Sequence, residues 1–171
     1  MHYDPVLHVV LYQPEIPANA GAIGRTCVAV GAKLWLVRPL GFRINDRDLR
    51  RAGLDYWKHL EWEVVDDWDH LLARLPLEER PPWFFTKSAT KRYTEAGFAP
   101  GDVLVFGSET HGLPNRLWAA TPTRTLRIPI RPQVRSLNLS VSVGVAVYEA
   151  LRQWSDPGQP KSTSVWRGLG T

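Results

Sequence analysis

Short apolar runs that alternate with segments of helical periodicity constrain the fold of this chain most. The first run, Val6–Tyr12 (VLHVVLY), is almost wholly apolar, as is typical of a parallel strand buried on both faces. A proline-containing loop follows, and Asn19 is then the predicted N-cap of a helix that runs to about Val30 and stops at Gly31. Strands alternating with helices predict an α/β domain with a mainly parallel sheet.

The same periodicity predicts six strands in all, with helices on both faces of the sheet. The other five strands are expected at Lys33–Val37, Trp62–Val65, Pro82–Thr86, Val103–Phe106 and Thr125–Ile130. Further helices are expected at 46–52, 55–59 and 67–75. The valines of 138–154 alternate as in a strand, but the length of this segment and its ending YEALRQW favour a helix. Ligands of such sheets bind in loops at the carboxyl ends of strands.

Length and cysteine usage limit the class of protein. A chain of 171 residues fits a single domain, predicted at 1–154, and the Ser-, Pro- and Gly-rich residues 155–171 predict a flexible tail. The single cysteine, Cys27, excludes an intrachain disulfide and a multi-cysteine zinc site, and we expect it to be a small buried hydrophobe. Without a signal-like start or an apolar run of about 18 residues, a cytoplasmic protein with no membrane association is expected.

The positive charge is concentrated in one part of the chain. The net charge is only +4, but 16 of the 21 basic residues are arginine, whose planar fork suits phosphates and stacked bases. Residues 61–79 hold seven acids and one arginine, whereas 110–148 hold no acid. The five arginines of that second stretch are Arg116, Arg124, Arg127, Arg131 and Arg135. They indicate either a face that binds a polyanion or an ordinary solvated surface.

Several familiar chemistries are excluded by spacing. The segment 107–112 (GSETHG) has the glycine frame of a phosphate loop, but Leu113 and Pro114 stand where such a loop needs Lys and Ser or Thr. The chain contains no G-x-G-x-x-G after a strand, no G-x-S-x-G and no H-E-x-x-H. A nucleoside triphosphatase, a hydrolase and a metal enzyme are therefore disfavoured, and His8 is expected to be a core or edge histidine.

Three loops at predicted strand ends combine glycines with polar residues. They are 14–26 (PEIPANAGAIGRT), 106–114 (FGSETHGLP) and 128–140 (IPIRPQVRSLNLS). In the first, Asn19 and Arg25 could both face the strand end, or could be a helix cap and a surface arginine. In the second, the glycines allow close approach of a ligand, and Glu109 could accept a proton or face a cation. In the third, Ser136 or Asn138 could simply cap the last helix.

These motifs, with LRRAGLDYW at 49–57 and VYEALRQ at 147–153, appear in the order and spacing of a known family. Over roughly 6–154 the chain resembles the SPOUT superfamily of S-adenosylmethionine-dependent RNA methyltransferases, and within it the small ribose 2′-O-methyltransferases of the tRNA wobble nucleotide. The resemblance implies a deep trefoil knot in the carboxyl half, a homodimer, S-adenosylmethionine as methyl donor with S-adenosylhomocysteine as product, and no metal. The sequence departs from the family pattern at His111 and Val141.

Site residues follow from the resemblance, position by position. The cofactor-binding residues it implies are Phe85, Thr86, Gly107, Ile128, Ser136 and Leu137. The residues implied to contact RNA are Asn19, Arg25, His111, Arg131 and Arg135. The catalytic residues it implies are Arg25, Glu109, Ser136 and Asn138. Because an arginine stays protonated in proteins, we expect Arg25 to orient a phosphate and stabilise the developing alkoxide, with Glu109, Ser136 or an RNA phosphate on the proton path.

The function implied is methylation of the ribose 2′-hydroxyl of cytidine or uridine 34 in tRNA, with leucine tRNAs among the expected substrates. The alternatives are a ribose methyltransferase for another tRNA or rRNA position and a non-catalytic RNA-binding protein of the same fold. A domain this small is expected to bind the anticodon stem-loop across two protomers. The last helix offers an apolar stripe that is either interface or core, formed by Leu139, Val143, Val147, Leu151 and Trp154.

Overall fold

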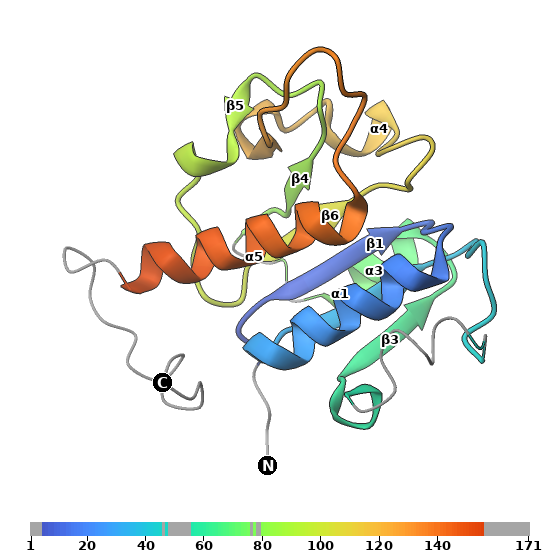
Figure 1. Ribbon diagram of the computed structural model, residues 1–171. Helices are drawn as coiled ribbons and strands as arrows, with labels where there is room; N and C mark the ends of the chain where they lie inside the picture. The colour runs from blue at the N-terminus through green and yellow to red at the C-terminus, as the bar shows by residue number, and fades with distance from the viewer. Residues whose placement is uncertain (1–4, 46, 48–55, 76, 78–79, 156–171) are drawn as a thin grey trace.

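A seven-stranded, wholly parallel sheet forms the centre of the molecule (Figure 1). The computed structural model describes residues 5–45, 47, 56–75, 77 and 80–155. The strand order is β3-β2-β1-β6-β4-β7-β5. The strands are β1 (His8–Tyr12), β2 (Lys33–Val37), β3 (Trp62–Val65), β4 (Trp83–Phe85), β5 (Lys91–Arg92), β6 (Val103–Phe106) and β7 (Thr125–Arg127).

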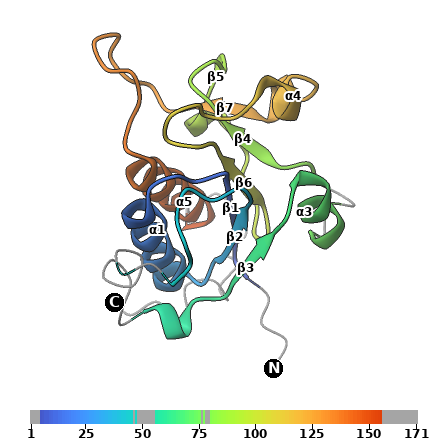
Figure 2. The same ribbon diagram turned by 90° about the vertical axis from the view of Figure 1, so that its right-hand side faces the viewer.

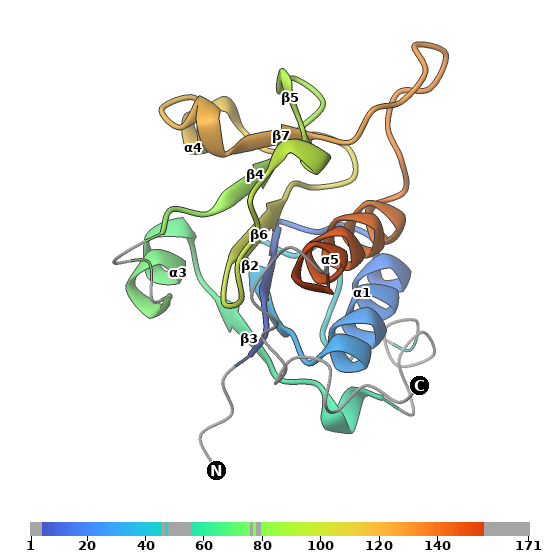
Figure 3. The same cartoon turned by 90° about the vertical axis from the view of Figure 1, so that its left-hand side faces the viewer.

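Helices cover both faces of this sheet. The two long helices, α1 (Pro17–Val30) and α5 (Leu139–Ser155), lie side by side on one face (Figures 1 and 2). The short helices α3 (Trp68–Arg74) and α4 (Asn115–Trp118) lie on the opposite side of the sheet (Figure 3). Three single-turn 3₁₀ helices complete the described elements, namely η1 (Trp57–His59), η2 (Tyr93–Glu95) and η3 (Pro122–Arg124).

The central strand β1 explains why the sequence contains an unbroken apolar run. Val9 and Leu11 point into the core under α1 and α5, whereas Val10 and Tyr12 point into the core under α3. All four side chains are buried. Since each buried side chain of this size contributes about 1.5–3 kcal/mol, a polar residue at any of these positions would be costly on either face.

Most of the predicted elements are confirmed, but some strands are shorter than predicted and the sheet has one strand more than predicted. Strands β2, β3 and β6 have the predicted bounds, while β1, β4 and β7 are shorter than predicted. The predicted six strands become seven because Lys91 and Arg92 pair with β7 at the sheet edge. Because these two cationic residues carry no apolar periodicity, strand β5 could not be predicted from the sequence. The helix predicted at 46–52 lies mostly outside the described residues, and of 55–59 only η1 is described.

The last helix is confirmed, and its apolar stripe belongs to the core. Leu139, Val143, Val147, Leu151 and Trp154 are all at most 8% exposed. They belong to the same core cluster as buried residues of β1, β2 and α1, so the interpretation of this stripe as an interface is wrong. The helix reaches Ser155, and the predicted tail otherwise lies outside the described residues. The trefoil knot stays a prediction. No helix in the described part of the chain is long and apolar enough to cross a membrane.

Cys27 of α1 is buried as expected, and burial raises the pKa of its thiol to about 12. Because the thiolate is the reactive form, we predict that iodoacetamide at pH 8 leaves Cys27 unmodified in the folded protein. The same reagent should modify it completely in 6 M guanidinium chloride, a denaturant concentration of the order that unfolds most domains. Mass spectrometry of the intact chain measures both, and rapid labelling of the folded protein would contradict the prediction.

Candidate functional site

Three neighbouring strands bring part of the predicted cofactor-binding set together. Strands β6, β4 and β7 are adjacent in the sheet, and Gly107, Phe85 and Ile128 stand at or directly after their carboxyl ends. The rings of Phe85 and Phe106 stack at 4.6 Å between centroids with 15° between their planes. Ile128 packs against the same core. These positions therefore form an apolar wall at this edge of the sheet, in which Phe85 and Phe106 are themselves buried and Ile128 is half-buried.

Thr86 and Gly107 shape the loops around this wall. The Thr86 hydroxyl accepts a hydrogen bond from the Ser88 N–H at 3.3 Å, which closes a local turn. A Cβ at Gly107 would lie 2.0 Å from the Gly112 carbonyl carbon and 2.2 Å from the Leu113 nitrogen. The glycines of this loop were expected to let a ligand approach closely. At Gly107 it is instead the backbone of Gly112 and Leu113 that approaches closely. Any side chain there would force the loop open.

The Glu109 carboxylate accepts three hydrogen bonds from the start of the first motif. Its donors are the Glu15 N–H at 2.8 Å, the Ile16 N–H at 3.1 Å and the Asn19 side-chain amide at 3.2 Å. Helix α1 begins after Ile16, whose side chain cannot cap it, and the positive end of the helix dipole favours a carboxylate at this place. Glu109 therefore joins the loop after β6 to the N-terminus of α1.

Asn19 extends this contact to the third motif. Its side-chain oxygen accepts a hydrogen bond from the Asn138 amide at 3.0 Å. Asn138 in turn accepts from the N–H groups of Ser140 at 2.9 Å and Val141 at 3.3 Å, so it caps α5 as the sequence allowed. We call these three side chains the Glu109–Asn19–Asn138 network. It joins all three motifs by hydrogen bonds.

The prediction that Asn19 is the N-cap of α1 is wrong. The helix begins at Pro17, so Asn19 lies in its first turn and is only 7% exposed. Proline is favoured at the first helical position because it has no N–H to leave unpaired. The expectation that Asn19 faces the strand end is confirmed by its bonds to the two loops.

Two further residues that the sequence did not single out hold the first motif in place. The Gly41 N–H donates to the Pro14 carbonyl at 2.9 Å, and a Cβ at Gly41 would lie 2.6 Å from the Glu15 carbonyl oxygen. On the other side, the Thr110 hydroxyl makes a short hydrogen bond to the Glu15 carboxylate. The segment before α1 is therefore clamped between the loop after β2 and the loop after β6.

Arg25 lies outside this network. Its guanidinium donates from Nη2 to the Tyr56 hydroxyl at 3.2 Å, and its Cζ lies 4.6 Å from the centroid of the same ring. Arg25 is exposed, two turns along α1 from Asn19. Arg25 and Asn19 therefore contact different neighbours, and Tyr56 is a site residue that sequence reasoning did not name individually.

The remaining predicted site residues lie on exposed loops. Residues 131–138 are all exposed, including Arg131, Arg135, Ser136 and Leu137, and so is His111 in the loop after β6. Leu137 is 36% exposed, although it is apolar. The structure thus does not bring Ser136 and Leu137 into contact with Phe85 or Gly107 through any described bond. Only Asn138, at the end of this segment, is tied to the other motifs.

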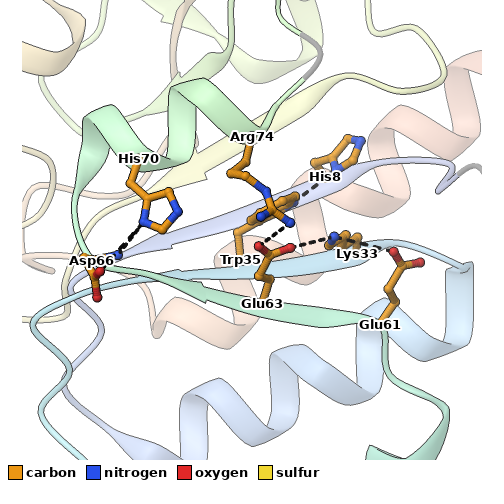
Figure 4. Close-up of polar contacts among 8 residues, drawn as sticks. All are labelled: His8, Lys33, Trp35, Glu61, Glu63, Asp66, His70 and Arg74. Carbon is orange, nitrogen blue, oxygen red and sulfur yellow. Dashed lines mark hydrogen bonds and ion pairs between the residues drawn. The ribbon is translucent and has the colours of Figure 1, made fainter.

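Two residues of the acidic stretch, Glu61 and Glu63, are paired with cations at the other edge of the sheet. Glu63 on β3 pairs with Arg74 of α3 at 2.7 Å and with Lys33 of β2 at 3.1 Å, and Glu61 also faces Lys33 at 3.6 Å (Figure 4). Buried beside them, His8 accepts a hydrogen bond from the Trp35 indole at 3.0 Å, as expected for a core histidine (Figure 4). These acids therefore do not offset the positive charge of the loops at the candidate site.

The β5–β7 edge, by contrast, gathers positive charge. Lys91 and Arg124 both lie over the Trp83 ring, at 5.3 and 4.2 Å from its centroid. Burial lowers the pKa of Arg124, and Asp102 partly opposes this shift. Arg92 stands directly opposite Arg127 in the sheet register. Among the described residues no three His, Cys, Asp or Glu side chains gather as a metal site.

The chain is similar to known RNA-modifying proteins along nearly its whole length. Residues 6–148 match the model of the family described as SpoU rRNA Methylase. A Burkholderia ambifaria protein named tRNA (cytidine(34)-2'-O)-methyltransferase is 44% identical over 86% of this chain and 96% of its own length. A solved structure described as "Structural insights into the 2-OH methylation of C/U34 on tRNA" gives a TM-score of 0.82 at 48% identity, over 87% of this chain and 96% of that one.

A more distant structure has the same fold. The SpoU methyltransferase AviRb of Streptomyces viridochromogenes, solved in complex with the cofactor AdoMet, gives a TM-score of 0.75 at 24% identity. The match covers 90% of this chain and 59% of that chain. At this identity the likeness concerns the fold alone.

The network predicts a stability effect at Asn19. Asn19→Ala removes one donor from Glu109 and leaves the Asn138 amide without its partner, so we expect the free energy of unfolding to fall by about 1–3 kcal/mol. Urea unfolding followed by circular dichroism measures the change. Asn115→Ala, at an exposed position of α4, is the matched control and should change the free energy by less than about 0.5 kcal/mol. Equal unfolding curves for both variants would contradict the network.

Proposed function

The chain belongs to the SpoU methylase family, and on this premise we propose that it methylates the ribose 2′-hydroxyl of nucleotide 34 in tRNA, where the base is cytidine or uridine. The observation that carries the proposal is the Glu109–Asn19–Asn138 network, which gathers three family motifs beside the apolar strand ends. The relative from Burkholderia ambifaria is named for the cytidine 34 reaction and matches this chain over 96% of its own length. The protein is thus an S-adenosylmethionine-dependent RNA methyltransferase.

The residues at the strand ends fit S-adenosylmethionine. An adenine ring has apolar faces and a hydrogen-bonding edge, which suit Phe85, Ile128 and the backbone of the surrounding loops. We propose Phe85, Thr86, Gly107 and Ile128 as the fixed part of the cofactor site, and Ser136 and Leu137 as the part that the exposed segment 131–138 contributes. When bound, the cofactor supplies a methyl group on a positively charged sulfur that leaves as a neutral thioether.

The work left to the protein is alignment of the 2′-oxygen and stabilisation of the charge that develops on it. Arg25 supplies guanidinium donors on an exposed side chain, so it can hold a phosphate or the developing alkoxide. Glu109 already accepts three hydrogen bonds from the segment at the start of α1, which hold its carboxylate in the network. We therefore assign Glu109 and Asn138 to positioning of the loops, and Ser136 or an RNA phosphate to the path of the departing proton.

The basic loops suit the tRNA anticodon stem-loop. Arg131 and Arg135 are exposed, and neither forms an ion pair with another described residue. With His111 they lie on segments that flank the cofactor site, so phosphate contacts there would place an RNA loop next to the methyl donor. We propose tRNA as the partner of this surface and the cytoplasm as the place where the protein acts.

A second protomer is part of the proposal. The outward side of α5 exposes Val141 (50%) and Tyr148 (54%), two turns apart on one helix face, and Val134 of the neighbouring segment is also 50% exposed. Exposed apolar residues of this size are typical of an interface. We propose that a second copy of the chain covers this face and with it the exposed segment 131–138.

Methyl transfer tests the function directly. With S-adenosylmethionine and unmodified tRNA, leucine tRNAs first, we expect the wild-type protein to make the linkage after nucleotide 34 resistant to alkaline hydrolysis. Arg25→Ala should lower the rate by about 10²- to 10³-fold, as expected for loss of a group that stabilises an oxyanion. Cofactor affinity in calorimetry should stay within about twofold, because the wall at Phe85 and Ile128 is intact.

Arg38→Ala is the matched control, because Arg38 is an exposed arginine near the opposite edge that pairs with Asp66 at 3.7 Å. It should methylate like the wild type. Resistance at another nucleotide, or on rRNA, would show a different target. Thermal stabilisation by tRNA without any stabilisation by S-adenosylmethionine would identify a binding protein that has lost the chemistry.

The dimer predicts an effect at Tyr148. Tyr148→Glu places a charge on an apolar face that a second copy would bury, so we expect the variant to be monomeric in analytical ultracentrifugation where the wild type is dimeric. Leu72→Glu, an exposed position of α3 on the other face of the sheet, should leave the mass unchanged. A wild-type protein that sediments as a monomer at micromolar concentration would overturn the interface.

A further inference from the structure

We propose that Tyr56 is a positioning residue, which fixes the guanidinium of Arg25 in the orientation that methyl transfer needs. The inference rests on the proposed function and extends it to a residue outside the three motif loops. Tyr56 belongs to the segment LRRAGLDYW, most of which lies outside the described residues. The described part of that segment, Tyr56 and Trp57, lies against α1 at Arg25.

Two contacts of different kinds act on the same guanidinium. The Tyr56 hydroxyl accepts a hydrogen bond from Arg25 Nη2 at 3.2 Å, and the Tyr56 ring lies 4.6 Å from Arg25 Cζ. The stacking contact restricts the guanidinium to the neighbourhood of the ring, and the hydrogen bond restricts its rotation there. An exposed arginine without such contacts samples many rotamers, so Tyr56 reduces the number of orientations available before RNA arrives.

Tyr56 is itself held in place from behind. It precedes η1, and a Cβ on Gly24, the neighbour of Arg25, would lie 3.1 Å from the Trp57 ring and 3.0 Å from Leu60 Cδ2. Trp57 also packs against Trp62 of β3, with 5.3 Å between ring centroids. The absence of a side chain at Gly24 therefore lets η1 approach α1 closely. As a result, the residue after Tyr56 packs against the residue before Arg25, and this packing holds Tyr56 next to Arg25.

The pair leaves Arg25 free to act on RNA. A guanidinium has five N–H donors, and in the described part of the chain Arg25 forms no ion pair that would neutralise it. A tyrosine partner orients the group while leaving its charge uncompensated, which a carboxylate partner would not do. This arrangement suits a side chain whose target is an anionic oxygen of the substrate.

Rates of three variants test the inference. Tyr56→Ala removes both contacts, and we expect kcat for tRNA methylation to fall about tenfold, within the usual range for coupled neighbours. Tyr56→Phe keeps the ring and loses only the hydroxyl, so its kcat should lie between those of Tyr56→Ala and the wild type. Combined with Arg25→Ala, under single-turnover conditions with excess protein, Tyr56→Ala should cause less than about a twofold further loss.

A purely structural role for Tyr56 would give a different pattern. In that case Tyr56→Ala would lower the rate by the same factor in the wild-type and in the Arg25→Ala background, and this result would overturn the inference. A Tyr56→Ala protein with wild-type kcat would overturn it as well. Leu72→Ala, at an exposed position of α3, is the control and should keep wild-type kcat. A wild-type protein that does not methylate nucleotide 34 would overturn the proposed function and this inference together.

Discussion

The site depends on one carboxylate that accepts three hydrogen bonds from a segment far away in the sequence. Glu109 accepts from two backbone N–H groups before α1 and from the Asn19 amide, and Asn19 passes the contact on to Asn138 at the start of α5. Asn19 lies 90 positions from Glu109 and 119 positions from Asn138 in the sequence. One network nevertheless lies at the beginning of both long helices. Because Asn19 is buried and a buried amide without partners is costly, the three loops have to keep their relative positions together.

The fold was largely predictable because its signals are local. Apolar runs gave β2, β3 and β6 with correct bounds, and Gly31 ends α1 in the left-handed conformation that glycine favours. Where the prediction was wrong, the determining contact is remote. Ile16 precedes α1 without a side-chain cap of its own because the carboxylate arrives from Glu109, so local capping rules pointed to Asn19 instead. Strand β5 exists only through its pairing with β7.

The place of several candidate residues at the strand ends was predictable from the sequence, whereas their contacts were not. The topology places Phe85, Gly107 and Ile128 on neighbouring strand ends, as expected for ligands of a parallel sheet. The motif pattern, however, treats Asn19 and Arg25 as one unit, whereas the structure gives them different partners. Gly41 was not singled out, and Gly24 was noted only as part of the first motif, because no sequence pattern reports which atoms a Cβ at these positions would collide with.

The exposure of 131–138 bears on how the protein assembles. This segment carries Ser136 and Leu137, yet every residue in it is exposed in the single chain. A cofactor wall formed only by Phe85, Gly107 and Ile128 would leave one side of a bound ligand open to water, and water competes with the alignment that transfer needs. The exposed apolar residues Val134 and Val141 lie on this segment and just beyond it. A surface that closes over them would also close the cofactor site, so dimerisation and catalysis would depend on the same contact.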